Sequence, residues 1–542
     1  MAAPMTWRRL VYSVYTPALS GVFSRISDRL FRTQDRRRGS SLLLLAPLLA
    51  ETDTTPASSR PPGSTGAAGL HSRFHWIAEH VPAFRVPGGR IHILHSPDEF
   101  YQAMKARIKT AKRRVVMASL YLGTGPLEQD LVNCMEEALE RSQEDTAANL
   151  KVSILLDYTR GSRGKNNSRT MLLPLLQRFP EQMRVCLYHT PDLRGLLRLL
   201  VPERFNETIG VQHIKVYLFD DSLIISGANL SDSYFTNRQD RYVLLEGCRE
   251  VADFFAELVR AVSDVSLQLE SDDSVHTKEG MVHPYKGNRT DFSTSAQKQI
   301  MEVINTARVQ QNLQDLEHSQ DSDLELESGE ERSDTWVFPL VQMKPLGIRL
   351  DEEVTQRLLW EAGGDSTVYL TSGYFNLTRT YMRLVLGAAA DYRILMASPE
   401  VNGFFGAKGV AGAIPEAYIH IAGQFYRQVC DLGQQSRIHL QEYHRPDWTF
   451  HAKGLWYYLQ GNSRPCLTLI GSPNFGYRSV HRDIEAQIAI VTENEELQAN
   501  LQQEQEMLYK RSTEVSSSTF KQPDRHVKLW VKLVTPFIKN FF

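Results

Sequence analysis

The sequence predicts an α/β fold made of two similar halves, on the evidence of alternating patterns and of a repeated order. An apolar, β-rich run at 114–121 is followed by helical spacing at 127–139. The same order returns as a strand at 367–374, a helix at 377–386 and a strand at 391–397. Strands alternating with helices indicate a layer of parallel strands, and the repeated order indicates an internal duplication.

Length and composition indicate a soluble globular protein with more than one domain. The chain has 542 residues, too many for one ordinary core, with 42% hydrophobic and 23% charged residues. We expect a leader and linker at 1–70, a first half at 85–265, a connector at 266–335, a second half at 336–510 and a C-terminal segment at 511–542.

The first forty residues have the composition of a mitochondrial transit peptide. They are rich in Arg and Ser and poor in acids, and a Pro/Ser/Thr/Gly-rich linker follows at 54–69. The alternative is a disordered basic tail. The longest apolar stretch, 42–50, contains Pro47 and is too short to span a bilayer. If this protein handles lipid, it is therefore expected to do so from the membrane surface.

Two further segments have unusual composition. Residues 311–334 hold many acids among Ser and Gln, which predicts a disordered insertion. Residues 526–542 mix Lys with large apolar residues, and this pattern fits either a final core element or an interfacial anchor. Pro536 is expected to prevent one uninterrupted helix there.

Charge and cysteine content exclude some classes of protein. Lys plus Arg number 61 and Asp plus Glu 63, so the basic excess typical of a general nucleic-acid binder is missing. The five cysteines are scattered without a Cys-x-x-Cys pair, which predicts reduced thiols and no zinc knuckle.

The first candidate module covers residues 211–229. In a strand, residues two apart share a face, so His213 and Lys215 point the same way. A turn at 220–222 returns the chain and brings Asn229 beside His213. Asp240 follows Asn229 by eleven residues.

The second candidate module repeats this order. His451 and Lys453 are followed by a longer turn, then by Ser472 and Asn474, and Glu485 comes eleven residues after that Asn. A single His-x-Lys is a weak motif, and 526–528 is one without a following hairpin. The doubled composite is much more specific.

These residue types suit displacement at a phosphodiester. Two imidazoles can divide the roles of nucleophile and acid–base, while lysines and asparagines bind nonbridging oxygens. Each carboxylate, Asp240 or Glu485, is expected to hold the far ring nitrogen of the histidine of its own half. No metal or other cofactor is expected, because His-x-Lys offers no ligand pair and no Cys cluster is present.

The two modules resemble the half-sites of the phospholipase D superfamily. HIKVYLFD at 213–220 is the motif H-x-K-x4-D, and HAKGLWYY at 451–458 is a degenerate copy with Tyr458 in place of the Asp. The resemblance implies α/β/α halves packed face to face around one shared active site. It places Asp220 with the catalytic residues His213, Lys215, His451 and Lys453, although in the family this Asp mainly supports the hairpin.

The resemblance, with the Arg-rich leader, also implies an activity. We expect transfer of a phosphatidyl group from CDP-diacylglycerol to glycerol 3-phosphate through a phosphohistidine on His213, with His451 as acid and base. The expected place is the matrix side of the mitochondrial inner membrane, without nucleic acid as a partner. Alternatives are a cardiolipin synthase, a phosphatidylserine synthase, a nuclease or a non-catalytic lipid-binding scaffold.

The expected substrate-binding residues are Asn229, Asn474, Asp240, Glu485, Ser472 and Arg478. Arg478 lies four residues after Asn474 and resembles an Arg-Ser step of the superfamily. Further cations for the acceptor phosphate are Arg160, Arg163 and Lys165, which follow a strand, and His444 and Arg445, which precede His451. For this second group, ordinary solvated charges are the alternative.

Overall fold

The computed structural model describes residues 73–144, 149–320, 333–407 and 409–541. The expected leader and linker at 1–70 lie outside the described residues, as does most of the acidic insertion. Both halves belong to one compact unit, residues 68–542.

The first half folds around a nine-stranded sheet. In spatial order its strands are β11 (Val275–His276), β10 (Leu267–Leu269), β5 (Met183–Tyr188), β4 (Lys151–Asp157), β3 (Arg114–Ala118), β6 (Val216–Phe219), β7 (Ser222–Ser226), β9 (Tyr242–Leu245) and β2 (Ile91–Leu94). β3, β4 and β5 are parallel. β6 runs antiparallel to β3 and forms a hairpin with β7.

The second half repeats this arrangement. Its strands are β1 (Phe84–Val86), β12 (Thr335–Met343), β20 (Glu485–Thr492), β19 (Leu467–Gly471), β18 (Lys453–Leu459), β14 (Ser366–Ser372), β15 (Asp391–Ala397), β16 (Ile438–Tyr443) and β21 (Ser512–Glu514), with β13 (Ile348–Arg349) beside β12. β14, β15 and β16 are parallel, and β18 is antiparallel to β14. The strand order β5-β4-β3-β6-β7-β9-β2 in the first sheet thus corresponds, position by position, to β16-β15-β14-β18-β19-β20-β12 in the second.

The expectation of a parallel sheet is correct for only part of each half. Three strands in each sheet are parallel, and the motif strands and their neighbours are antiparallel. The reason is the length of the connections. A two-residue turn joins Phe219 to Ser222, and such a short turn can join only antiparallel strands.

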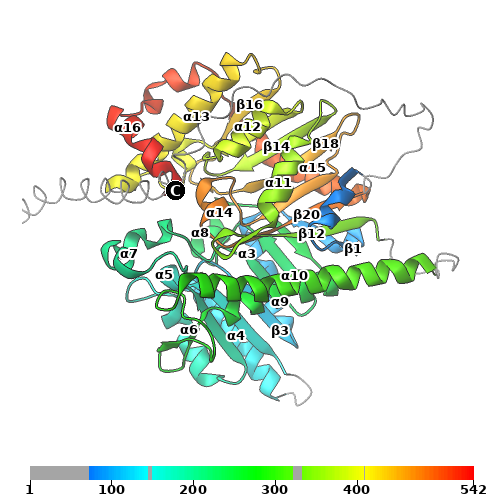
Figure 1. Ribbon diagram of the computed structural model, residues 1–542, viewed down its shortest axis with the longest axis vertical. Coiled ribbons are helices and arrows are strands. Elements are labelled where there is room, and N and C mark those ends of the chain that lie inside the picture. The colour runs from blue at the N-terminus through cyan, green and yellow to red at the C-terminus, as the bar shows by residue number, and fades with distance from the viewer. Residues whose placement is uncertain (1–72, 145–148, 321–332, 408, 542) are drawn as a thin grey trace, which may run out of the picture. The chain divides into compact units, whose positions relative to one another are not determined.

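Helices cover both faces of each sheet. On one face of the first sheet lie α3 (Pro97–Thr110), α4 (Pro126–Glu144) and α6 (Ser168–Arg178), and on the other α9 (Arg249–Asp264). On one face of the second lie α11 (Leu350–Trp360), α12 (Arg379–Gly387) and α13 (Ile414–Asp431), and on the other α15 (Glu495–Tyr509). Figure 1 shows the two halves with these helices.

One continuous apolar core joins the halves. Along β6, Val216 and Leu218 face this shared core with Ile488 of β20, whereas Tyr217 faces the core beneath α3 and α4. The alternation follows from the two-residue repeat of a strand. The shared core confirms two α/β/α halves packed face to face.

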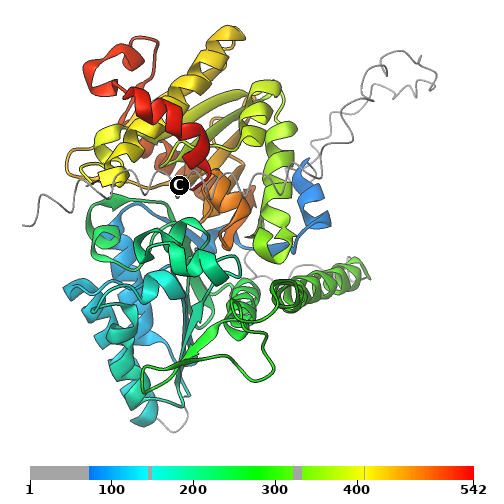
Figure 2. The same ribbon diagram turned by 60° about the vertical axis from the view of Figure 1, so that its left-hand side comes forward.

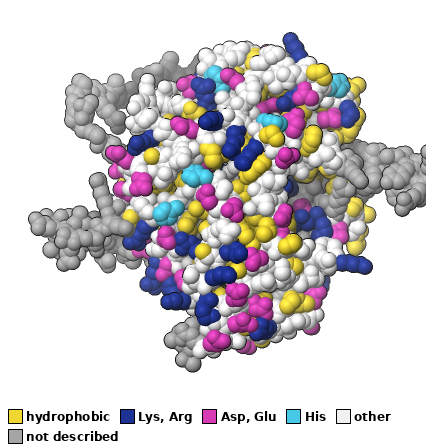
Figure 3. Space-filling view, turned by 180° about the vertical axis from the view of Figure 1, so that it is seen from behind, with side chains coloured by type: hydrophobic (Ala, Val, Ile, Leu, Met, Phe, Trp, Pro, Cys, Tyr) yellow, Lys and Arg dark blue, Asp and Glu magenta, His cyan; other side chains and the backbone are white. Residues whose placement is uncertain are grey.

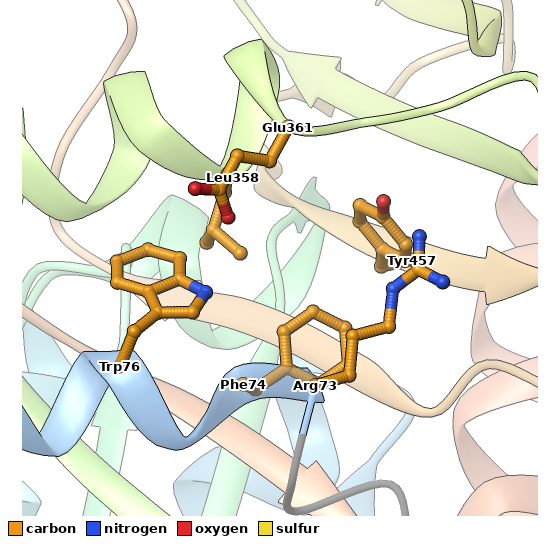
Figure 4. Close-up of a pocket in the computed structure, with 6 residues that line it drawn as sticks. All are labelled: Arg73, Phe74, Trp76, Leu358, Glu361 and Tyr457. Carbon is orange, nitrogen blue, oxygen red and sulfur yellow. The ribbon is translucent and has the colours of Figure 1, made fainter. Parts of the chain in front are cut away.

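The first described residues belong to the second half. Phe74 and Trp76 pack in its core, Arg73 pairs with Asp365, and β1 pairs with β12. Figure 4 shows a cavity of about 240 Å³ here, lined by Arg73, Phe74, Trp76, Leu358, Glu361 and Tyr457. The described part of the chain therefore begins on the second sheet and then forms the first.

The connector is more helical than its composition predicts. α10 (Arg289–Gln320) continues through 311–320, so the expected disorder is wrong for those ten residues. Buried Phe292, Ile300 and Ile304 anchor the start of the helix, and Gln, Leu and Glu extend it readily. Residues 321–332 lie outside the described part of the chain.

The C-terminal segment forms α16 (Leu529–Ile538), and the expected interruption at Pro536 is not observed. Pro536 lies two residues before the end of α16, where its missing N–H costs one helical hydrogen bond without ending the helix. Val531 is buried against Ala417 of α13, whereas Leu529, Leu533 and Phe537 are exposed. Both interpretations of this segment therefore have support: one face packs and the other is apolar and open.

Candidate active site

Each histidine lies just ahead of its motif strand and bonds to the other half. His213 N donates to Ile484 O at 2.9 Å, and His451 N donates to Gln239 O at 2.8 Å. The second contact belongs to a small parallel sheet of β8 (Arg238–Gln239) and β17 (Thr449–Phe450). Ile484 and Gln239 each directly precede one of the two carboxylates, so the duplication places both histidines equivalently.

The two carboxylates are exchanged between the halves. His213 Nδ1 lies 2.8 Å from Glu485 Oε2, and His451 Nδ1 lies 2.6 Å from Asp240 Oδ2. The expectation that each carboxylate would hold the histidine of its own half is therefore wrong. The backbone pairing across the interface is the reason, because it sets each histidine beside the carboxylate of the other half.

The two lysines complete one buried cluster. Lys215 Nζ donates to His213 O at 2.8 Å, whereas Lys453 Nζ lies 2.7 Å from His451 Nδ1 and 3.6 Å from Asp240 Oδ2. Gly227 lets this cluster form, since a Cβ there would lie 2.7 Å from Lys453 Nζ of the other half. The motif groups of both halves thus share one site.

Burial lowers the pKa of both imidazoles and so disfavours their protonated forms. Desolvation, with help from Lys453, lowers the pKa of His451 to about 3. Burial and the nearby Lys215 lower the pKa of His213 well below its usual value. Both rings are therefore neutral at physiological pH and have a lone pair available for attack or for proton transfer.

Burial and ion pairs shift the pKa values of the other charged groups of the cluster. Burial lowers the pKa of Lys215 to about 7. Burial raises the pKa of Glu485, whereas Lys453 and His451 overcome burial and bring the pKa of Asp240 below its ordinary value. Asp240 therefore stays ionised and favours the charged form of its histidine.

The expected asparagines lie at the cluster, and the expected serine has a structural contact. Asn229 and Asn474 each have a buried Oδ1 without a hydrogen-bond partner among the described residues. Ser472 Oγ instead bonds the backbone of Ala486. Ser479, which sequence reasoning missed, donates to Glu485 Oε1 and so orients it.

Asp220 lies at the other end of β6 from His213. Its carboxylate accepts the backbone N–H groups of Lys112, Arg113 and Arg114 at 2.8–3.1 Å. Its own φ is +51°, so it also forms the tight turn of the hairpin. These contacts fix the hairpin and do not touch the histidines.

Arg478, on α14 (Tyr477–His481), lies near His213. Its Nε donates to Asp483 Oδ2 at 2.9 Å, and Asp483 Oδ1 accepts Val211 N at 3.0 Å. Asp483 also groups with His213 and Glu485 in a way that resembles a metal site. The oxygens of both carboxylates already accept hydrogen bonds from protein donors, so this set is accounted for as an ion-pair network.

The other expected cations are less suited to a ligand. Arg160 and Arg163 both pair with Glu207, and Lys165 is exposed. Arg445 stacks on Trp448, with Cζ 3.2 Å from the ring centre. His444 is exposed. These contacts favour ordinary surface roles.

Three aromatic and basic side chains at the site were not predicted from the sequence. Tyr234 Oη lies 3.4 Å from His451 Nε2, and Arg238 NH1 donates to the same Oη at 3.2 Å. Tyr374 packs edge-on against His451, with ring centres 5.8 Å apart. Aligning the two modules finds one of them: Tyr234 and Ser479 both lie five residues after their Asn.

The chain is similar over its whole length to known enzymes. It is 63% identical over 551 residues to the mitochondrial CDP-diacylglycerol–glycerol-3-phosphate 3-phosphatidyltransferase of Homo sapiens, covering 100% of this chain and 99% of the relative. It is 38% identical to a probable enzyme of the same name from Dictyostelium discoideum, covering 91% and 84%, and 33% identical to that of Schizosaccharomyces pombe, covering 85% and 95%.

A solved structure shows the same fold. The phosphatidylserine synthase of Haemophilus influenzae matches with a TM-score of 0.63 at 18% identity, covering 88% of this chain and all of the other. No protein-family model matches the sequence. From these similarities and the duplicated site, the chain belongs to the CDP-diacylglycerol–glycerol-3-phosphate 3-phosphatidyltransferase family.

Proposed function

We propose that this protein transfers the phosphatidyl group of CDP-diacylglycerol to glycerol 3-phosphate, giving phosphatidylglycerol phosphate and CMP. The observation that carries this proposal is the pair of exchanged His–carboxylate contacts, His213 with Glu485 and His451 with Asp240, in one buried cluster with two lysines. The names of full-length relatives supply the substrates. The product is a precursor of phosphatidylglycerol and cardiolipin.

In the first step, His213 Nε2 attacks the phosphatidyl phosphorus. A phosphorus–nitrogen bond forms, and the bond to the CMP oxygen breaks. Glu485 accepts the Nδ1–H of His213 and stabilises the imidazolium that develops. Lys215 and Lys453 offset the negative charge of the nonbridging oxygens, and the amide N–H groups of Asn229 and Asn474 donate to them.

His451 moves the protons. The negative diphosphate opposes the effects of burial and Lys453, and so favours a protonated His451 that donates to the departing CMP oxygen. In the second step, neutral His451 takes the proton from the 1-hydroxyl of glycerol 3-phosphate. That oxygen attacks phosphorus and releases His213. Two in-line displacements give retention of configuration at phosphorus.

The hydroxyls beside the two rings support His213 as the nucleophile. Tyr234 Oη contacts His451 Nε2, so this nitrogen already takes part in a hydrogen bond with a hydroxyl. The corresponding hydroxyl of the other half, Ser479 Oγ, is turned to Glu485 instead. Stronger orientation of the carboxylate partner suits a ring that must carry a covalent group.

We also place the reaction at the mitochondrial inner membrane, on its matrix side. The relatives are named mitochondrial, and the first forty residues are rich in Arg. No described helix is both long and apolar enough to cross a bilayer. Surface contact is supported by α7 (Gly195–Leu200) and α16, which contain no acids and expose Leu196, Leu199, Leu529, Leu533 and Phe537.

The segments that follow these two helices both contact one arginine beside the active site. Arg482, next to Asp483, donates to Thr208 O after α7 and stacks on Phe541 after α16. Figure 1 shows both helices on its left-hand side, and in Figure 2 that side comes forward with α16 in red. A diacylglycerol substrate held in a bilayer would meet the site from this side.

An acceptor assay tests the proposal. Purified protein is incubated with vesicles of CDP-diacylglycerol and, separately, glycerol 3-phosphate, glycerol, serine, phosphatidylglycerol or nucleic acid. Glycerol 3-phosphate is expected to give by far the most product, and His213→Ala is expected to abolish it. His526→Ala, the His-x-Lys histidine outside the cluster, is the matched control and should retain activity.

Other outcomes would identify the alternatives. Phosphatidylserine or cardiolipin as the main product would replace the proposed acceptor, and cleaved nucleic acid would indicate a nuclease. On the face in Figure 3, described Lys and Arg side chains are interspersed with Asp and Glu, which does not favour nucleic acid. Vesicle binding without any product would indicate a scaffold.

A further inference from the structure

Arg238 is a cation at the active site to which the proposed steps give no role. It lies on β8, two residues before Asp240. NH1 donates to Tyr234 Oη at 3.2 Å, and Cζ lies 4.5 Å from the centre of that ring. Its Nε is buried without an acceptor in the described part of the chain.

The neighbouring arginines show what Arg238 is missing. Arg478 pairs with Asp483 at 2.9 Å, and buried Arg241 pairs with Glu504 at 2.8 Å. Among the described residues, no Asp or Glu forms an ion pair with Arg238. A partly buried guanidinium without a counter-charge, with its Nε buried, favours an anionic ligand at this position.

The position of Arg238 relates this anion to the chemistry. Arg238 and His451 Nε2 contact the same atom, Tyr234 Oη, at 3.2 and 3.4 Å. An anion on Arg238 therefore lies beside the nitrogen that we assign to the leaving and attacking oxygens. CMP carries its phosphate at the leaving oxygen, and glycerol 3-phosphate carries its phosphate on the third carbon from the attacking oxygen.

The backbone of Gly403 packs closely beside this cation. Gly403 borders it, since a Cβ at that position would lie 2.7 Å from Tyr374 Oη and 3.8 Å from Arg238 NH1. Tyr374 in turn packs on His451. A larger residue at position 403 would therefore displace Tyr374, which contacts His451, and would crowd Arg238.

We propose that Arg238 forms a phosphate subsite that selects a phosphorylated alcohol as the acceptor over a neutral one. This inference rests on the proposed function and adds the residue that sets its acceptor class. The guanidinium binds the nonreacting phosphate of glycerol 3-phosphate and so orients the 1-hydroxyl toward His451. The same subsite receives the phosphate of CMP as it departs.

A competition assay tests this subsite. Vesicles of CDP-diacylglycerol are incubated with labelled glycerol 3-phosphate and a large excess of glycerol, and the ratio of the two lipid products is measured. This ratio reports how the covalent intermediate partitions, so it does not depend on the rate of the first step or on the amount of folded enzyme. Wild type, Arg238→Gln, Arg238→Lys and Arg437→Gln are compared.

Arg437 provides a matched control because it is a partly buried arginine that donates only to groups at the end of α12 and its neighbours. Arg238→Gln should lower the ratio by roughly 10–100-fold, the usual effect of losing a hydrogen bond to a charged group. Arg238→Lys should give an intermediate ratio, since Lys keeps the charge but lacks the planar guanidinium that can bind two phosphate oxygens at once. Arg437→Gln should match wild type.

The outcomes separate this inference from the proposed function. An unchanged product ratio in both Arg238 variants, with glycerol 3-phosphate still preferred, would overturn the subsite and leave the function intact. Wild type that makes no phosphatidylglycerol phosphate would instead overturn the function. If Arg238→Gln yields too little folded protein, the ratio from Arg238→Lys decides alone: equality with wild type overturns the subsite.

Discussion

The two half-sites carry the same reactive groups but rely on different supports. In the first half, Asp220 holds the hairpin through three backbone N–H groups. At the corresponding position of the second half, Tyr458 bonds Gln505 of α15 at 3.0 Å. The comparison teaches that the groups at the phosphorus are duplicated while the means of holding the hairpin has diverged.

The second hairpin has an additional support that crosses the interface. Arg241 enters it from the first half, donates to Leu469 O and Thr468 Oγ1, and pairs with buried Glu504. Gly454 gives it room, because a Cβ there would lie 2.6 Å from Arg241 NH1, and its φ of +122° suits Gly. Loss of the motif Asp is thus offset by a contact from the neighbouring half.

The largest expected effect tests whether the histidines differ in role. His213→Ala should reduce kcat by roughly 10⁴-fold or more, because removing a nucleophile removes the covalent route. His451→Ala should reduce it by roughly 10²–10⁴-fold, the range for general acid–base catalysis. The measurement is the initial rate with CDP-diacylglycerol vesicles and glycerol 3-phosphate.

A trapping experiment sharpens this comparison. After acid-free denaturation, phosphatidyl label from CDP-diacylglycerol should stay on His451→Ala and be absent from His213→Ala. Label on His213→Ala, at residue 451, would reverse the assignment of roles.

The next effect concerns the exchanged carboxylates. Asp240→Asn and Glu485→Gln should each lower kcat by about 10²–10⁴-fold, because an amide no longer favours the correct tautomer of its histidine or stabilises the imidazolium. Since the partners cross the interface, Asp240→Asn should disturb the proton-transfer histidine, and Glu485→Gln the nucleophile. Trapped label should therefore persist in Asp240→Asn and fall in Glu485→Gln; the opposite pattern would contradict the exchange.

This exchange also marks the limit of prediction from the sequence. Both modules, their order and the eleven-residue spacing to each carboxylate could be read from the chain, because strand geometry and hairpins are local. Which carboxylate meets which histidine could not, because it depends on backbone pairing such as His213 N to Ile484 O across the interface. Arg238 and Tyr234 were missed for the same reason: they gain meaning only beside His451.

Other errors came from treating composition as structure. The acidic residues near 311–320 resemble disordered segments, but the helix begins at an anchored apolar stretch and propagates through them. Pro536 resembles a helix breaker, but α16 tolerates it two residues before its end, at the cost of one helical hydrogen bond. Local patterns predicted the elements well, whereas tertiary contacts decided their ends.

A smaller effect is expected from the lysine beside the nucleophile. Burial lowers the pKa of Lys215 to about 7, and its protonated form is the one that offsets phosphate charge. As pH rises through this value the free enzyme loses that charge, so kcat/KM should fall by up to about tenfold per pH unit above 7. Lys215→Arg stays charged and should move this decline to higher pH. The profiles of kcat/KM are compared by shape, and an unchanged decline in Lys215→Arg would assign it to another group.

The smallest effects test the supports of the two hairpins. Asp220→Ala should destabilise the protein by about 1–3 kcal/mol, because three backbone N–H groups lose their acceptor, and Tyr458→Phe by about 0.5–1.5 kcal/mol for one lost hydrogen bond. Thermal unfolding should therefore show a lower Tm for both variants, with the larger decrease for Asp220→Ala. Because neither side chain contacts a histidine, kcat of the folded fraction should remain near wild type. A normal Tm with lost activity in Asp220→Ala would instead show that Asp220 is catalytic. A half-site would then need the whole motif, and the second half, which has Tyr458 at this position, would be incomplete.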